Sequence, residues 1–110
     1  MINFYLSKNL KKTEEFWCNT LGLSVYMRQP NAIIFQGDEG QIGFLDSPHA
    51  TPPNYSCISF TFESREEIDT LYQQHQSIAL APPKEHPLSP VYSFFMLDPN
   101  GLRVEFQVFI

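Results

Sequence analysis

Hydrophobic and polar positions alternate in several short stretches, and the clearest of these closes the chain. Its apolar positions are Leu102, Val104, Phe106 and Val108, and the polar positions between them are Arg103, Glu105 and Gln107. A period of two predicts a strand with one apolar and one polar face. The preceding Asp-Pro-Asn-Gly at 98–101 is typical of a tight turn. We predict that Glu105 points either to solvent or into a concave site.

The same patterns predict a strand, a helix and three further strands in the first half. Alternation over 2–7 indicates a strand that buries Ile2, Phe4 and Leu6. Asn9 or Ser7 can cap a helix over 10–21, and Gly22 can end it. Its apolar side comprises Leu10, Phe16 or Trp17, and Leu21. Three extended segments follow at 23–29, 32–36 and 41–46, separated by turns.

The second half repeats this order. Residues 47–55 contain three prolines and are interpreted as a linker. A strand is predicted over 57–62, and Ser64 with Glu67 forms a capping box for a second helix whose apolar side is Ile68, Leu71 and Tyr72. A short strand at 77–80, a proline-rich loop at 81–90 and strands at 92–97 and 102–108 complete the repeat.

The predicted fold class is α+β, with two tandem βαβββ modules in one domain of residues 1–110. Module 1 spans about 1–46 and module 2 about 56–110. One such module cannot cover its own sheet, whereas two together can. We expect curved mixed sheets around a central cleft, with the helices on the outer face. Strand parity, with the repeat alignment for Phe44, predicts these cleft residues: Asn3, Tyr5, Phe44, Cys57, Ser59, Thr61, Arg103, Glu105 and Gln107.

Composition and charge exclude several classes of partner. The 110 residues, 43% hydrophobic and 17% charged, fit a folded globular chain. The net charge of −5 would repel phosphate backbones and anionic lipids, so neither nucleic acid nor a membrane is expected as a partner. The opening residues show no signal-peptide pattern, which favours a cytoplasmic protein. Cys18 and Cys57 lack CxxC spacing and are expected to be free thiols.

Two motifs resemble the vicinal oxygen chelate superfamily, which includes glyoxalases, bleomycin resistance proteins and extradiol dioxygenases. The run NLKKTEEFWCNTLGL at 9–23 is similar to its opening helix, and DPNGLRVEFQ at 98–107 is similar to its closing turn and glutamate strand. This resemblance implies the paired-module fold and a homodimer. It also implies a divalent metal held by four positions, of which Glu105 matches the last.

The other three metal positions do not match well. They fall on Ile2 or Met1, on Phe44, and on Cys57, of which only Cys57 is a plausible ligand. His49, His75 and His86 are interpreted as surface residues, although His86 could reach over the cleft in a loop. Arg103 could instead neutralise Glu105 on the same strand face.

These observations leave three functional hypotheses, the first two of which involve a small-molecule site. The first is a small-molecule binding protein without the usual metal site and with no other cofactor. The second is a divalent-metal-dependent lyase, transferase or dioxygenase with altered ligands, in which Glu105 is catalytic and binds the metal with Cys57, and His86 is an additional candidate ligand. A third is a domain that pairs with other proteins, which a sealed cleft would favour.

Overall fold

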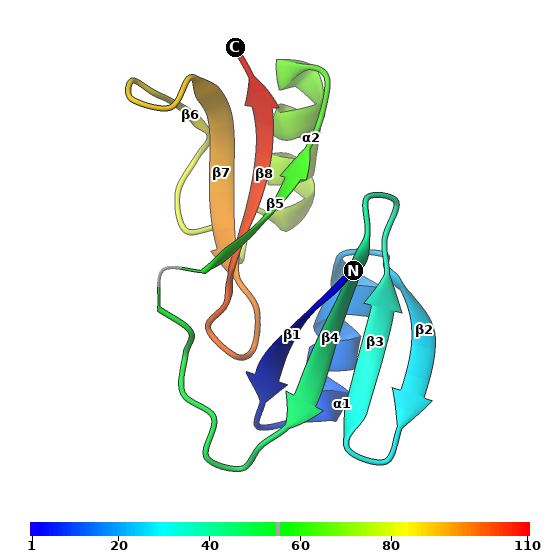
Figure 1. The fold of residues 1–110 in the computed structure, drawn as a ribbon. Coiled ribbons are helices and arrows are strands. Elements are labelled where there is room, and N and C mark those ends of the chain that lie inside the picture. Colours follow the sequence, from blue (N-terminus) through cyan, green and yellow to red (C-terminus); the bar gives the residue numbers. More distant parts are fainter. Residues whose placement is uncertain (55) are drawn as a thin grey trace. The chain divides into compact units, whose positions relative to one another are not determined.

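The computed structural model describes residues 1–54 and 56–110, which form two compact units (Figure 1). The first unit holds β1 (Ile2–Ser7), α1 (Leu10–Glu14), the π-helical η1 (Glu15–Thr20), β2 (Ser24–Gln29), β3 (Ala32–Gln36) and β4 (Gln41–Asp46). The second holds β5 (Cys57–Thr61), α2 (Arg65–His75), β6 (Lys84–His86), β7 (Val91–Leu97) and β8 (Arg103–Phe109). The turn Asp98–Gly101 belongs to the first unit by its contacts.

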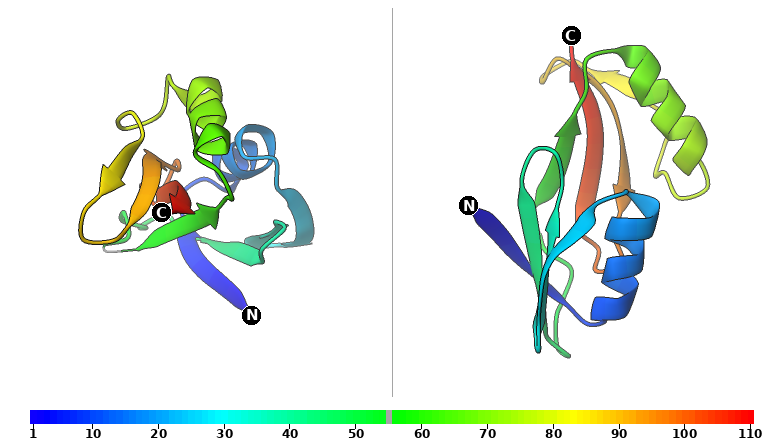
Figure 2. Two further views of the ribbon diagram at one scale, coloured as in Figure 1. Left: turned by 90° about the horizontal axis from the view of Figure 1, so that it is seen from above. Right: turned by 90° about the vertical axis from the view of Figure 1, so that its right-hand side faces the viewer.

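Each unit is a four-stranded mixed sheet with one helical segment, so the predicted βαβββ repeat is confirmed. Sheet A has the order β1-β4-β3-β2, and sheet B has the equivalent order β5-β8-β7-β6. The first strand of each unit pairs in parallel with the last, and the other pairings are antiparallel. Figure 2 shows each helix against one face of its own sheet, which leaves the opposite, open face without a helix.

Both predicted helix caps are present. The Asn9 side chain accepts a hydrogen bond from the backbone N–H of Lys12, and Ser64 accepts one from Glu67. The first helix widens into a π-helical turn at Glu15. This turn buries the adjacent residues Phe16 and Trp17, which the regular helix of the prediction presented as alternatives.

Sheet B buries the apolar positions that the alternation of the last strand predicted. Val104, Phe106 and Val108 are buried, and Phe106 stacks on Phe94 with ring centroids 5.1 Å apart. The α2 side chains of Tyr72 and His75 contact these two rings. The core of this unit therefore lies between α2 and the Phe94/Phe106 face of sheet B.

The prediction for β1 is wrong about which face is buried. Ser7 is fully buried and its hydroxyl lies 2.8 Å from the Thr13 hydroxyl of α1, whereas Phe4 and Leu6 are 45% and 49% exposed. A polar side chain tolerates this burial because it has a hydrogen-bond partner. The Phe4 ring lies over Gly43 on the open face, where a Cβ on Gly43 would come within 2.4 Å of it. A glycine in β4 thus provides the space that places Phe4 outside the core.

The outer strand of sheet B was also predicted at the wrong residues. The fourth strand is β6 at Lys84–His86, inside the segment interpreted as a loop, and the predicted strand at 77–80 makes only an isolated bridge between Ala79 and Met96. Between Pro83 and Pro87, three residues with free backbone N–H groups can pair with β7.

Candidate functional site

The open face of sheet B carries the polar side chains of three paired strands. The parallel pairing of β5 with β8 sets Cys57 beside Arg103, Ser59 beside Glu105 and Thr61 beside Gln107. Antiparallel pairing with β7 sets Phe95 beside Glu105 on the other side. Paired residues point to the same face of a sheet, so the six cleft residues predicted in module 2 do share one face.

Ser59, Glu105 and Gln107 form a directed chain of hydrogen bonds on this face. The Gln107 amide donates to the Ser59 hydroxyl, which in turn donates to Oε1 of Glu105 at 2.9 Å. The three side chains are half-buried. A hydroxyl has one proton, so accepting from Gln107 leaves that proton for the carboxylate. These two hydrogen bonds therefore fix the orientation of the Glu105 side chain.

A hollow of about 580 Å³ opens beside Glu105 in the second unit. Its lining combines apolar side chains with few polar groups, namely His86, Pro87, Leu88, Ser89, Val91, Phe95, Glu105, Gln107 and Phe109. This size and composition are typical of small-molecule sites. The hollow is the strongest candidate site in the part of the chain that the structure describes.

His86 and Arg103 both lie against Phe95, which lines the hollow. The His86 ring meets the Phe95 ring edge-on with centroids 6.1 Å apart, and its Nε2 lies 3.1 Å from the Ser93 hydroxyl. The Arg103 guanidinium lies over the Phe95 ring at 6.0 Å from its centroid. Between Arg103 and Glu105, both within the described range, no ion pair forms. The pairing that the sequence offered to neutralise Glu105 is therefore replaced by a contact with Phe95.

Cys57 is an exposed free thiol on the same face. Desolvation raises its pKa, and the negative charge of Glu105 raises it further, against a smaller lowering by Arg103. A raised pKa keeps the thiol protonated, and thiolate is the form that binds metal or attacks electrophiles.

The described residues do not provide the donor set of a metal centre. Over 1–54 and 56–110, no three His, Cys, Asp or Glu side chains lie close enough together to hold an ion. Glu105 and His86 both line the hollow, and Cys57 does not. Catalytic zinc sites usually have three protein ligands, so these residues do not fit one.

The three predicted cleft residues of module 1 lie on the helix side of sheet A. Phe44 is fully buried, and its ring centroid lies 5.7 Å from that of Trp17 in η1. The ring of Tyr5, which pairs with Phe44, lies 6.2 Å from it, and Asn3 shares the parity of Tyr5. The predicted open-face positions of Asn3, Tyr5 and Phe44 are therefore wrong, because Ser7 rather than Phe4 and Leu6 faces the helix and Phe44 pairs in register with Tyr5.

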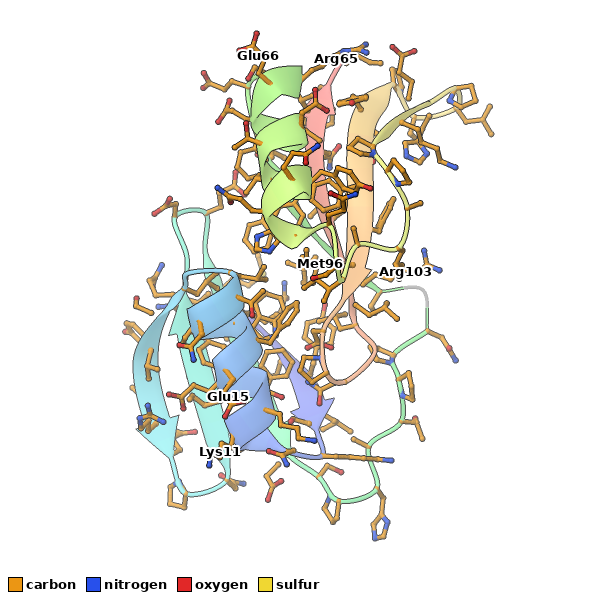
Figure 3. All side chains as sticks on the ribbon, turned by 180° about the vertical axis from the view of Figure 1, so that it is seen from behind. Lys11, Glu15, Arg65, Glu66, Met96 and Arg103 are labelled. Atoms are coloured by element: carbon orange, nitrogen blue, oxygen red, sulfur yellow. The ribbon has the colours of Figure 1, made fainter. Side chains whose placement is uncertain are left out.

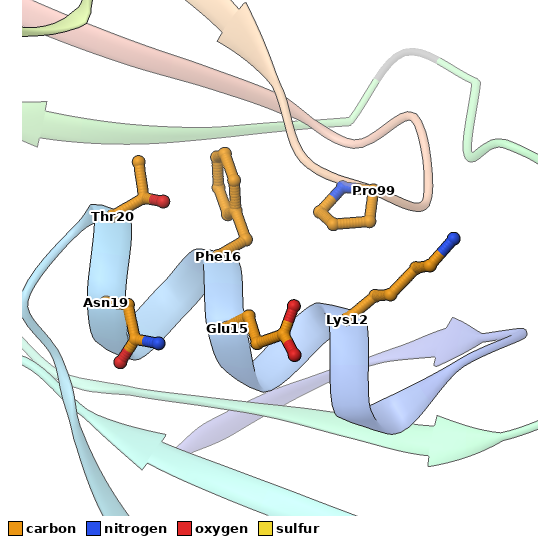
Figure 4. A pocket seen from close by; sticks show the side chains of 6 residues that line it. All are labelled: Lys12, Glu15, Phe16, Asn19, Thr20 and Pro99. Atoms are coloured by element: carbon orange, nitrogen blue, oxygen red, sulfur yellow. The ribbon is translucent and has the colours of Figure 1, made fainter.

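The first unit has a shallower hollow between its helix and the Asp98–Gly101 turn. Figure 4 shows its lining side chains, which come from one side of α1 and η1 and from the turn: Lys12, Glu15, Phe16, Asn19, Thr20 and Pro99. Figure 3 shows Lys11 and Glu15 on the same helical segment, on the side away from sheet A. The lining of this shallower hollow carries charges of both signs on exposed side chains. It therefore does not favour one class of ligand as clearly as the hollow beside Glu105 does.

Sequence reasoning missed Phe95, which pairs with Glu105 and lines the hollow. Strand parity could have found it, because Ser93 and Phe95 alternate with the core residues Phe94 and Met96. His86 was interpreted mainly as a surface residue, and β6 places it at the hollow.

Comparison with known proteins agrees with this architecture. Residues 4–106 match the family model described as Glyoxalase/Bleomycin resistance protein/Dioxygenase superfamily. Among curated proteins, no match to the chain was found.

Several solved structures share the fold. A glyoxalase/bleomycin resistance protein/dioxygenase from Nocardioides is 21% identical, with a TM-score of 0.84 over 100% of this chain and 82% of its own. A lactoylglutathione lyase from Agrobacterium tumefaciens is 17% identical, with a TM-score of 0.79 over 98% of this chain and 91% of its own. A fosfomycin resistance protein from Listeria monocytogenes is 17% identical, with a TM-score of 0.81 over 100% and 92%. At these identities the likeness concerns the fold alone.

Proposed function

The chain belongs to the Glyoxalase/Bleomycin resistance protein/Dioxygenase superfamily, and from this premise we propose that it binds a small molecule without the usual divalent metal. The proposed binding site is the hollow on the open face of sheet B. The observation that carries the proposal is its lining, which pairs apolar side chains with a single oriented carboxylate.

The shape and polarity of the hollow support a small-molecule ligand. Ligand pockets range from about 300 to 1,000 Å³, are mostly apolar and carry a few placed polar groups. Here Val91, Phe95 and Phe109 provide apolar area, and Glu105 and Gln107 provide polar atoms. The six open-face residues of β5 and β8 are proposed to contact the ligand or to position those that do.

The chemistry of the donor set supports binding without a metal. Glu105 already accepts a hydrogen bond from Ser59 through Oε1, and the nearest thiol, Cys57, is held in its protonated form by a raised pKa. A divalent cation bound through the other oxygen of Glu105 would find no second anionic ligand in the lining of the hollow.

Metal analysis tests this proposal directly. Protein purified without chelator should contain far less than one equivalent of zinc, nickel, manganese or iron. Its melting temperature should not change when these ions are added, because a ligand stabilises only the state that it binds. Stoichiometric metal combined with thermal stabilisation would refute the proposal.

A metal-dependent lyase, transferase or dioxygenase is the second candidate function. It is favoured by the presence of Glu105 and His86 in the lining of one hollow. In that case Glu105→Gln should abolish metal uptake, while Glu85→Gln, which removes an acid outside the hollow, should not. Equal metal content in both variants would count against this candidate.

We also propose that the chain forms a homodimer. Cross-strand pairing lines up Phe4, Gly43, Ile34 and Met27 on the open face of sheet A, where Phe4 and Met27 are 45% and 44% exposed. Of these residues, Ile34 and Gly43 are buried, so the exposed apolar area lies on the two edge strands; apolar area on an open sheet face favours association. Sedimentation should give a dimer mass that falls to a monomer mass in Phe4→Ser/Met27→Gln, whereas Leu80→Ser, at another exposed apolar position, should remain dimeric. A monomeric native chain at micromolar concentration would contradict the proposal.

A further inference from the structure

The hollow on sheet B has its fixed charge at one point. Among the residues that line it, Glu105 is the only Asp or Glu, and there is no Lys or Arg. The fixed charge of the lining is therefore negative and lies on Glu105 alone. The whole chain carries −5 at pH 7, which adds to the attraction of positive ligands.

One oxygen of the Glu105 carboxylate is left for a ligand. Oε1 accepts from Ser59, and Ser59 is held in place by Gln107. Within the described residues, no side chain or backbone N–H donates to Oε2. A half-buried carboxylate oxygen that accepts no protein hydrogen bond has an unmet preference for a donor, most strongly for a charged one.

The cation two residues from Glu105 in the sequence is directed elsewhere. Arg103 lies on the same strand and face as Glu105, but its guanidinium is placed over the Phe95 ring. Phe95 is the cross-strand partner of Glu105, so the aromatic ring and the carboxylate lie side by side at the hollow. The electron-rich face of a ring attracts a second cation by the same interaction that attracts Arg103.

We propose that the ligand of this hollow is an organic cation, in which an ammonium, amidinium or guanidinium group contacts Glu105 and a flat or apolar body lies against Phe95, Val91 and Phe109. This inference rests on the proposed function, because it names the ligand class of the same site. Glu105 is the specificity-determining residue, and Ser59 and Gln107 are positioning residues. An anionic ligand would face the carboxylate without a compensating positive group in the lining.

Three nearly isosteric probes test the ligand class on the full chain. Benzamidine is a cation at neutral pH, benzamide is neutral and benzoate is an anion. Binding is measured by titration calorimetry, with the ring resonances of Phe95 and Phe109 followed by NMR to confirm the site. Benzamidine should bind at least about ten-fold tighter than benzamide, as expected for a hydrogen bond with both partners charged, and benzoate should bind weakest.

Variants separate local recognition from overall charge. Glu105→Gln should bring the benzamidine-to-benzamide affinity ratio close to one. Glu85→Gln removes the same charge from β6, where Glu85 is ion-paired with Arg65, and should leave the ratio unchanged. Ser59→Ala should lower the ratio part of the way, and Ser59→Thr, which keeps the hydroxyl, should restore it. A purely structural role of Ser59 would weaken all three probes equally and leave the ratio as it is.

The outcomes distinguish the ligand class from the proposed function. If benzoate or benzamide binds as tightly as benzamidine and shifts the same rings, the cation class is wrong and the small-molecule site remains. If no probe shifts either ring at millimolar concentration, both proposals fail. A benzamidine preference that survives in Glu105→Gln would overturn the assignment of Glu105.

Discussion

Asp98 and Glu105 are two carboxylates of one hairpin, and the structure uses them in opposite ways. Asp98 is 4% exposed and accepts hydrogen bonds from the indole N–H of Trp17 at 3.1 Å and from the backbone N–H of Asn100 at 2.8 Å. Glu105 is half-buried, accepts from Ser59 through Oε1 and lines a hollow. A carboxylate whose lone pairs are taken by its own chain stabilises the fold, whereas one with a spare oxygen is available to a ligand.

The aromatic residues Phe44 and Phe95 repeat this contrast. Phe44 is fully buried against Trp17, and Phe95 lines the hollow with its ring half-buried. The first unit thus places a carboxylate and an aromatic ring in its core. The second unit places a carboxylate and an aromatic ring at an accessible surface. The difference predicts that substitutions in the first unit affect stability and that those in the second affect binding.

The largest expected effect is that of removing the Phe44 ring. Phe44→Ala should lower the free energy of unfolding by about 3–5 kcal/mol, because the loss of a buried ring leaves a cavity. Phe95→Ala should cost about 1 kcal/mol and weaken benzamide binding instead. Urea denaturation of both variants measures this difference. Equal losses of stability would remove the contrast between the two rings.

Removal of the Asp98 carboxylate should have the next largest effect. Asp98→Ala should cost about 2–3 kcal/mol, because it leaves the buried Trp17 N–H without this acceptor. Asp98→Asn keeps an amide oxygen in reach and should cost less. Thermal melting gives the order of the two variants, and tryptophan fluorescence reports the change around Trp17. The reverse order would show that Asp98 does not act as the acceptor for Trp17.

Glu105→Gln should leave stability within about 0.5 kcal/mol of the native value, as is usual for surface changes outside caps and cores. The amide keeps the shape of the side chain and can still accept from Ser59. Chemical denaturation of Glu105→Gln and Asp98→Ala compares their free energies of unfolding. A loss as large as that of Asp98→Ala would mean that Glu105 stabilises the fold.

The smallest predicted effect is a loss of stability on mild acidification through His75. Desolvation lowers the pKa of His75, which stacks on Phe106. A folded-state pKa below the unfolded value means that the unfolded chain binds the proton first, so the stability contribution is present above the unfolded pKa and falls as pH decreases through it. Melting of native protein and His75→Gln between pH 8 and pH 5 should show a smaller decrease in the variant. Parallel curves would exclude this contribution.

Sequence patterns predicted the second unit better than the first, for physical reasons. The alternation in β8 follows burial directly, so the polar face with Arg103, Glu105 and Gln107 was correctly identified. In β1, burial of Ser7 depends on the Thr13 hydroxyl, and exposure of Phe4 depends on Gly43 in another strand. Both depend on contacts with other elements of the fold, which the local alternation of apolar and polar residues does not reveal.

The site was only partly predictable for the same reason. Parity placed Glu105 and Ser59 on one face, but the contribution of Phe95 and His86 depends on the register of β7 with β8 and β6. The direction of Arg103 toward Phe95 could not be inferred from spacing, because two residues on one strand face can either pair or diverge.

The contact between Pro52 and Gly101 limits how the chain between the units can vary. Gly101 has φ of +82°, and a Cβ there would lie 2.9 Å from the Pro52 ring, so the proline sits directly on the turn. Upstream of it, Ala50 is buried and Ser47 bonds to the Ser7 carbonyl. Residues 47–52 therefore behave as part of the first unit rather than as a spacer. Insertions or deletions in natural variants should accumulate after Pro52, where added length does not disturb the contact between Pro52 and the turn at Gly101.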